Sequence, residues 1–103
     1  MMLAAYDLES FQHDETIAWK SIEVATVNGN AVRYRTMQDM TASWHVHDDS
    51  DELFYVISGT VHMDTEQGVH EIPAGHLFVV RAGTRHRARV EGRASMLVVD
   101  CIG

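Results

Sequence analysis

The sequence predicts an all-β fold in which short strands close into a barrel or a sandwich of two facing sheets. Turn signals recur along the chain, among them Asn28-Gly29-Asn30, Ser58-Gly59 and Pro73-Ala74-Gly75. The segments between the turns are rich in Val, Ile, Phe, Tyr and Thr, which favour extended structure. Strands spaced by about 8 to 12 residues with turns between them are typical of these folds and leave little room for helices.

The turns delimit nine predicted strands. We place them at residues 19–27, 31–38, 40–47, 53–58, 60–66, 69–72, 76–81, 86–91 and 95–101. Asn28-Gly29 lies between the first two strands and predicts a tight hairpin. We expect residues 1–18 to form an N-terminal cover segment, with a helical turn or irregular structure in its polar part, and residues 19–103 to form the barrel domain.

Length and composition predict one soluble globular domain. The chain has 103 residues, of which 46% are hydrophobic and 22% are charged. It has no apolar run near the roughly 20 residues of a membrane-spanning helix, and its opening residues do not form a signal peptide. The single Cys101 excludes an internal disulfide and a cysteine-based metal cluster, which fits a reducing compartment. We therefore expect a cytoplasmic protein with no membrane partner.

The charge argues against nucleic acid as a partner. With 15 acidic and 8 basic residues, the chain has a formal net charge of −7 and would repel a phosphate backbone. A basic cluster nevertheless lies late in the chain and consists of Arg81, Arg85, Arg87, Arg89 and Arg93. We interpret this cluster as outward charge on an edge strand, with contact to an anionic ligand as the alternative.

The stretch from Trp44 to Gly59, WHVHDDSDELFYVISG, carries the candidate chemistry. Side chains two positions apart in an extended chain point to the same face, so His45 and His47 would project into one space. Glu52 follows after four intervening residues. Two imidazoles and a carboxylate supply most of a coordination shell for a divalent metal ion.

The missing ligand should come from a later strand beside this stretch, and His86 is the best candidate. In the run that it opens, His86, Ala88 and Val90 share one face, while Arg87 and Arg89 share the other. A small or apolar face with one histidine suits a barrel wall that carries a ligand. Three imidazoles and one carboxylate would leave two positions of an octahedron for water or substrate.

Strand alternation also predicts an outer face. If His45 and His47 point inward, the same parity turns Met40 and Ala42 outward. In the next strand, an inward Glu52 places Leu53, Tyr55 and Ile57 on the outside, which is too apolar for contact with water alone. We therefore expect the N-terminal residues, a second copy of the chain, or both to cover this face, and a homodimer is predicted. A strand shifted by one residue is the alternative, because such a slip exchanges the faces.

At this point the chain resembles a small single-domain cupin. The first motif of that family is HxH, three or four residues, Glu, six residues and Gly, and it is matched by His45, His47, Glu52 and Gly59. Gly75, Gly83 and His86 match the second motif in the same way. The resemblance covers roughly residues 40–100 and implies a double-stranded β-helix, the jelly-roll barrel of cupins.

Three positions depart from the family pattern. Arg81 stands where the second motif has proline, Val90 where it has asparagine, and Asp39 where the first motif opens with glycine. None of the three is a metal ligand in the pattern. Arg81 replaces a rigid turn residue with a long cation, and we favour an effect on the loop before His86 over contact with a bound anion.

Further residues are assigned to the pocket or to the surface. The candidate pocket residues are Phe54, Val56, Met63, Phe78 and Arg81, although core packing alone would explain the four apolar ones. The remaining histidines, His13, His62, His70 and His76, are expected at the surface or at edges, with His62 the one to check for a pocket position.

Two functions follow from this site. The first is a metal-dependent enzyme, of oxygenase or isomerase type, that acts on a small organic molecule with Mn, Fe, Co, Ni, Cu or Zn as cofactor. Glu52 would then be the catalytic residue, either as a ligand only or as a base that detaches. The alternative is a non-catalytic module that binds a sugar or another small ligand, a function that the resemblance also implies. A structural scaffold is disfavoured, because all four candidate ligands are retained.

Overall fold

The computed structural model describes residues 3–11 and 14–102, and its regular structure there is almost entirely β. One short 3-10 helix, η1, precedes the strands. The elements are η1 (Leu8–Ser10), β1 (Trp19–Val27), β2 (Asn30–Thr41), β3 (Glu52–Ser58), β4 (Thr60–Thr65), β5 (Gly68–Pro73), β6 (Leu77–Val80) and β7 (His86–Cys101). None of the helical structure in the described residues is long and apolar enough to cross a membrane.

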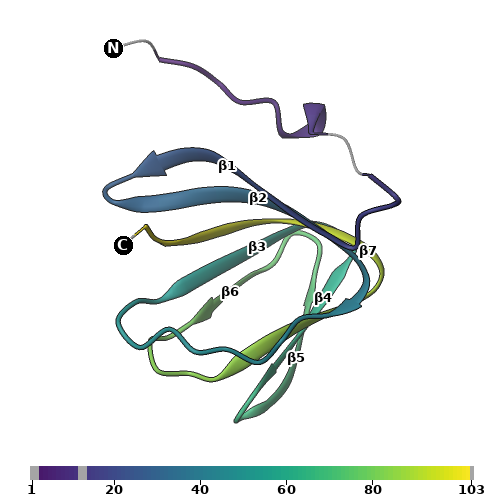
Figure 1. Cartoon of the computed structure of the whole chain (residues 1–103), viewed down its shortest axis with the longest axis vertical. Helices are drawn as coiled ribbons and strands as arrows, with labels where there is room; N and C mark the ends of the chain where they lie inside the picture. Colours follow the sequence, from purple (N-terminus) through teal and green to yellow (C-terminus); the bar gives the residue numbers. More distant parts are fainter. Residues whose placement is uncertain (1–2, 12–13, 103) are drawn as a thin grey trace.

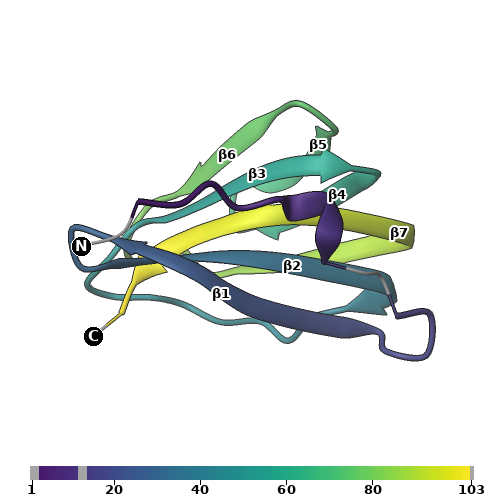
Figure 2. The same cartoon turned by 90° about the horizontal axis from the view of Figure 1, so that it is seen from above.

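The strands pair antiparallel in the order β1-β2-β7-β3-β6, and β4 pairs with β5 and with β7. β7 runs through both parts of the fold, because its first residues lie beside β4 and its later residues lie between β2 and β3. Figure 1 shows the strands wrapping around one interior, and Figure 2 shows the long β2 and β7 side by side. The predicted all-β jelly-roll barrel is confirmed.

The β1–β2 hairpin forms where the sequence predicts it. Val27 pairs with Asn30, and the two residues between them, Asn28 and Gly29, have φ of 50° and 76°. A two-residue turn with positive φ at both positions matches the right-handed twist of the strands that it joins. The asparagine and glycine therefore fix the register of the first two strands.

Two predicted strand boundaries are wrong. The breaks near residues 39 and 92–94 do not end a strand, because β2 runs on to Thr41 and β7 is continuous from His86 to Cys101. Asp39 takes a φ of 43° at the register shift in β2, and Gly92 has a φ of 74°. Each residue bends its strand without ending it, and the Asp39 carboxylate accepts a hydrogen bond from the Gly92 N–H at 2.6 Å.

The strand predicted at 40–47 is also wrong beyond Thr41. Residues 42–44 lie outside named strands, and only His45 forms a further bridge, to His86. Because residues 42–44 are not in regular strand structure, alternation counted back from His45 and His47 does not hold, and Met40 and Ala42 line the interior pocket although strand parity turns them outward.

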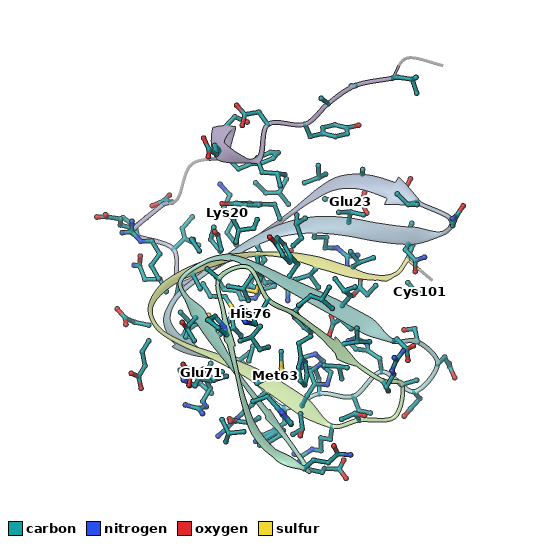
Figure 3. All side chains as sticks on the ribbon, turned by 180° about the vertical axis from the view of Figure 1, so that it is seen from behind. Lys20, Glu23, Met63, Glu71, His76 and Cys101 are labelled. Atoms are coloured by element: carbon teal, nitrogen blue, oxygen red, sulfur yellow. The ribbon has the colours of Figure 1, made fainter. Side chains whose placement is uncertain are left out.

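The core fills the barrel with side chains from facing strands. Phe54, Val56, Met63 and Met96 are almost fully buried and belong to one apolar cluster. Figure 3 shows Met63 inside the barrel and Cys101 at the edge near the end of the chain. Alternation in β3 is as predicted, since Glu52, Phe54 and Val56 are buried while the residues between them are more exposed.

The outer face of the main sheet carries an apolar row that crosses five strands. Cross-strand pairing aligns Ile22, Tyr34, Leu97, Tyr55 and Leu77 in that order. The N-terminal segment lies over this sheet, and Phe11 stacks on Tyr34 with ring centroids 5.4 Å apart (Figures 1 and 2). Leu77 stays 60% exposed, so the segment covers only part of the row.

The basic cluster is not the charged side of an edge strand. β7 has neighbours on both sides, and within the described residues the guanidinium of every arginine of the cluster except Arg85 pairs with a carboxylate. Arg87 and Arg89 both bind the buried Asp64, at 2.7 Å and 2.8 Å. Arg85 lies over the Trp44 ring instead. The edge-strand interpretation is therefore wrong, because β4 and the chain around His45 flank this half of β7.

Candidate metal centre

The fold brings the four candidate ligands together. His45, His47, Glu52 and His86 each offer one ligand atom, and these atoms lie within 4.8 Å of one another. We refer to these four residues as the ligand set. Ligands at about 2.1 Å from an ion are about 3 Å apart when adjacent in an octahedron and about 4.2 Å apart when opposite. The ligand set is therefore positioned to hold a metal ion.

Backbone pairing places the first and last members of the set. The His45 N–H donates to the His86 carbonyl at 3.0 Å, and the His86 N–H donates to the His45 carbonyl at 2.9 Å. This reciprocal bridge puts both side chains on one face, with ring centroids 4.1 Å apart. His47 is tied in by its carbonyl, which accepts the Gly83 N–H at 2.8 Å.

Glu52 lies at the centre of the set. It opens β3, and its side chain is only 4% exposed. Its Oε1 lies 3.0 Å from Nε2 of His86, 3.7 Å from Nε2 of His47 and 3.9 Å from Nε2 of His45. One carboxylate oxygen thus faces the same nitrogen atom of all three imidazoles, as a shared ion requires.

Two of the histidines are oriented by backbone carbonyls. Nδ1 of His86 lies 2.9 Å from the Thr84 carbonyl, and Nδ1 of His45 lies 3.2 Å from the Ser43 carbonyl. A carbonyl can only accept, so each Nδ1 carries the proton in these contacts. Nε2 of His86 donates to the Glu52 carboxylate at 3.0 Å, and a metal ion bound there would replace this proton. Nε2 of His45 faces Glu52 without a hydrogen bond and is available to a metal.

The electrostatics couple Glu52 to the histidines. Burial by itself raises the pKa of the Glu52 carboxyl, but the hydrogen bond with His86 and the charges of His47, His86 and Arg35 bring it below its ordinary value. Burial likewise lowers the pKa of His86, yet its bonds to Glu52 and to the Thr84 carbonyl raise it overall. Glu52 is therefore an anion at neutral pH and a ready ligand for a cation.

The ligand set lines the wall of a pocket of about 410 Å³. His86 is 1% exposed and Glu52 4%, whereas the His45 and His47 side chains are 42% and 38% exposed. One side of the set is thus closed by protein and the other faces the opening. The apolar part of the lining consists of Trp19, Met37, Met40, Ala42, Phe54 and Ala88.

Of the predicted pocket residues, Phe54 lines this pocket and the other four do not. Val56 and Met63 point inward but belong to the fully packed core. Phe78 packs against that core and lines a different hollow with Arg81. The three apolar side chains lie outside this pocket because inward-facing side chains fill most of a small barrel, and Arg81 lies outside it because its side chain is exposed.

Arg81 instead stabilises the loop near the ligands. Its guanidinium binds Asp51 at 3.1 Å, and the same carboxylate accepts the Ala82 N–H at 2.8 Å. The residue before Glu52 is thereby tied to the loop before His86. This contact supports the structural interpretation of Arg81, which is 74% exposed at its side chain.

The other departures from the motif also have structural explanations. The φ of 43° at Asp39 is one that glycine would adopt freely, and aspartate tolerates it better than most residues. Val90 is buried in the core cluster on the face that His86 begins, as predicted. Gly59, the last residue of the first motif, has a φ of 74°, and an added Cβ would lie 2.2 Å from the Arg93 carbonyl oxygen.

The remaining histidines lie apart from the ligand set. His62 is half-buried on β4 and does not line the pocket, while His76 is exposed with its Nδ1 3.2 Å from the Ala74 carbonyl. His70 lies beside Phe78, with ring centroids 4.9 Å apart. His13 lies outside the described residues.

Sequence reasoning missed two charged residues of the pocket, Arg35 and Asp100. They come from β2 and from the end of β7, outside the motif residues. Strand alternation could have identified Arg35, because Arg33, Arg35 and Met37 share one face of the predicted strand 31–38. Two arginines on the face that carries a core methionine indicate polar chemistry inside the barrel.

Comparisons with known proteins agree with this geometry. The family model for the cupin domain matches residues 33–100. The uncharacterized protein YdbB of Bacillus subtilis (strain 168) is 31% identical over 81 residues, which cover 78% of this chain and 71% of that protein.

Solved structures with low sequence identity share the fold. TT1209 from Thermus thermophilus superposes with a TM-score of 0.84 at 22% identity, over 96% of this chain and 97% of that one. A cupin-2 domain containing protein from Shewanella frigidimarina gives a TM-score of 0.77 at 21% identity, over 89% and 85% of the two chains. With the matching family model and the two motifs in place, the chain belongs to the cupin domain family.

Proposed function

We propose that this cupin is a metal-dependent enzyme that acts on a small organic molecule, with chemistry of the oxygenase or isomerase type. The observation that carries the proposal is the position of the ligand set, whose four ligand atoms lie within 4.8 Å of one another at the wall of a pocket. A purely structural ion would be enclosed on all sides, whereas His45 and His47 face the opening.

The chain's own residues have distinct roles in this proposal. His45 and His86 are held by their Nδ1 contacts and by the backbone bridge between them, so they present Nε2 in a fixed direction. The apolar wall, with Phe54 and Met37, excludes water from the substrate body. A divalent transition metal would supply Lewis acidity toward a substrate oxygen or, in the case of iron, reactivity with dioxygen.

Glu52 is the proposed catalytic residue as well as a ligand. Its anionic carboxylate is buried against His86, so it is suited to accept a proton from a substrate bound in the pocket or to remain a ligand throughout. The two roles are separated by Glu52→Gln and Glu52→Asp. If Glu52 acts as a base, Glu52→Gln retains part of the metal but loses turnover, whereas a ligand-only role makes turnover follow metal content in both variants.

The first experiment measures metal per chain. The purified protein is stripped with a chelator and reloaded separately with Mn, Fe, Co, Ni, Cu or Zn, and the bound metal is quantified by mass spectrometry. We expect about one ion per chain in the native protein and a large loss in His47→Ala and Glu52→Ala. His76→Ala is the matched control, because His76 is exposed and lies outside the ligand set.

The second experiment measures turnover. Metal-loaded protein is incubated with a panel of small hydroxy acids, oxo acids, sugars and enediol compounds, with and without dioxygen, and products are followed by mass spectrometry. Turnover that is lost in His47→Ala but kept in His76→Ala supports the enzyme. Ligand binding without turnover, in a protein whose metal is substoichiometric and insensitive to chelator, would instead establish the non-catalytic binding module.

A further inference from the structure

Arg35 lies in the same pocket as the ligand set but outside both motifs. It is on β2, where its register partners are Ser21 on β1 and Met96 on β7. Since Met96 is fully buried, Arg35 points to the interior of the barrel, and its side chain lines the pocket together with His45 and Glu52. A cation thus faces the space in front of the ligand set.

The guanidinium of Arg35 has no hydrogen bond or ion pair within residues 3–11 and 14–102. Its Nε is enclosed and without a partner. The two nearby carboxylates are engaged elsewhere, since Asp100 binds Arg33 and Glu52 faces the three imidazoles. Burying a charged group without a partner is costly, so such a group is a candidate for pairing with a ligand.

Trp19 fixes where this charge lies. The Arg35 Cζ is 5.0 Å from the centroid of the Trp19 ring, and both residues line the pocket. A guanidinium stacked on an aromatic face keeps its N–H groups at its edge, where they can form two parallel bonds to a planar anion. The tryptophan therefore holds the arginine ready to bind such a group.

The charges near Arg35 indicate how much negative charge the ligand carries. Burial, the larger effect, lowers the pKa of Arg35 while Glu52 and Asp100 raise it, and the guanidinium remains charged at neutral pH. The same two carboxylates would repel a second negative charge beside Arg35. A monoanion is favoured over a phosphate dianion, and the apolar wall of the pocket suits a ligand with a carbon body.

We propose that Arg35 is the anion-binding residue of this pocket and that its ligands are small organic monocarboxylates. Their carboxylate pairs with the guanidinium while a second oxygen atom of the same molecule turns toward the ligand set. This inference rests on the proposed function, because it names the substrate class of the same site.

The test compares acids with their uncharged amides. Calorimetric titrations with lactate and lactamide, benzoate and benzamide, and inorganic phosphate are run on the Zn-loaded and the metal-free protein. We expect each acid to bind about tenfold or more tightly than its amide, and phosphate to bind more weakly than the acids.

Arg35→Met should abolish the preference for the acid, and Arg35→Lys should keep part of it. Arg93→Met is the matched control, because Arg93 pairs with Glu15 away from the pocket and should keep the full preference.

A thermal unfolding measurement separates binding from a structural role. Because Arg35→Met removes a charge without a partner, the ligand-free variant should unfold at the same temperature as the wild type or higher. An unchanged preference for acids in Arg35→Met, equal binding of acid and amide by the wild type, or tighter binding of phosphate would each overturn the inference.

The outcomes for metal and for Arg35 are distinguishable. If the protein binds about one metal ion and turns over a substrate while Arg35→Met keeps the preference for acids, the proposed function stands and the role of Arg35 fails. The opposite outcome is a wild type that binds no metal but prefers acids to amides, with this preference lost in the Arg35 variants. The assignment of Arg35 then stands and the metal-dependent enzyme fails.

Discussion

His45 and His86 form a reciprocal backbone bridge, and this relationship assembles the metal centre. The two N–H groups donate across the bridge at 3.0 Å and 2.9 Å, and the imidazole rings lie 4.1 Å apart. Each ring is turned by a carbonyl two residues before it in the chain, that of Ser43 or of Thr84. The chain therefore positions ligands from its two motifs through main-chain bonds, which do not depend on the ion.

Metal affinity should fall as the pH falls through the histidine range. The bonds to Glu52 and Thr84 raise the pKa of His86 above 6.5, so protons compete for this ligand at a higher pH than for an ordinary imidazole. A chelator competition from about pH 8 to about pH 5 measures the effect. Affinity that stays constant into strongly acidic solution would contradict ligation by histidine.

Gly59→Ala should destabilise the barrel. A Cβ at this position would lie 2.2 Å from the Arg93 carbonyl oxygen, and the φ of 74° is itself unfavourable for alanine. We expect a loss of roughly 2 to 4 kcal/mol in the free energy of unfolding, measured in urea. Gly75→Ala is the control, because its φ is 82° but its Cβ would meet nothing within 4 Å. Equal losses in the two variants would show that the contact with Arg93 is unimportant.

Asp64 should contribute to stability in a pH-dependent manner. Its hydrogen bonds from Arg89 and Arg87 lower its pKa from 3.8 to about 2. A lowered folded-state pKa stabilises the fold fully above about pH 4, and this contribution is lost as the pH falls toward 2. The difference in unfolding free energy between the wild type and Asp64→Asn should therefore shrink over this interval, as measured by urea titration at each pH. Asp49→Asn is the control, because Asp49 lies in an exposed loop. A difference that does not vary with pH would contradict the assignment.

The partly covered apolar row predicts a homodimer. Leu77 is 60% exposed at one end of a row that runs through Tyr55 and Leu97, and a second copy would bury it. Leu77→Asp should shift the protein from dimer to monomer in light scattering after gel filtration. Val69→Asp should not, although Val69 is also 60% exposed, because it lies on the β4–β5 hairpin away from the row. A wild-type protein that is monomeric at high concentration would contradict the prediction.

The sequence was most informative where alternation and motif spacing coincide. In β3 the buried Glu52, Phe54 and Val56 follow the predicted parity, and in β7 the same holds from His86 to Val90. Alternation fails around residues 39–44, because Asp39 at positive φ shifts the register of β2 and the irregular residues 42–44 interrupt the strand before His45. The pocket wall was predicted poorly for a different reason. Alternation shows which side chains point into the barrel, but it does not show how far each one lies from the open end.

The fold class, the hairpin at Asn28-Gly29 and the four candidate ligands can be predicted from the amino-acid sequence, because turn chemistry, alternation and residue spacing are local properties of the chain. It took the folded molecule to show that Arg35 faces the same pocket with no carboxylate of its own, and that Arg81 binds Asp51 outside it. Charge pairing depends on which groups compete for each partner in space, and spacing along the chain does not reveal that competition. Asp100 binds Arg33, and this choice between two arginines on one strand face is made by the packing of β2 against β7.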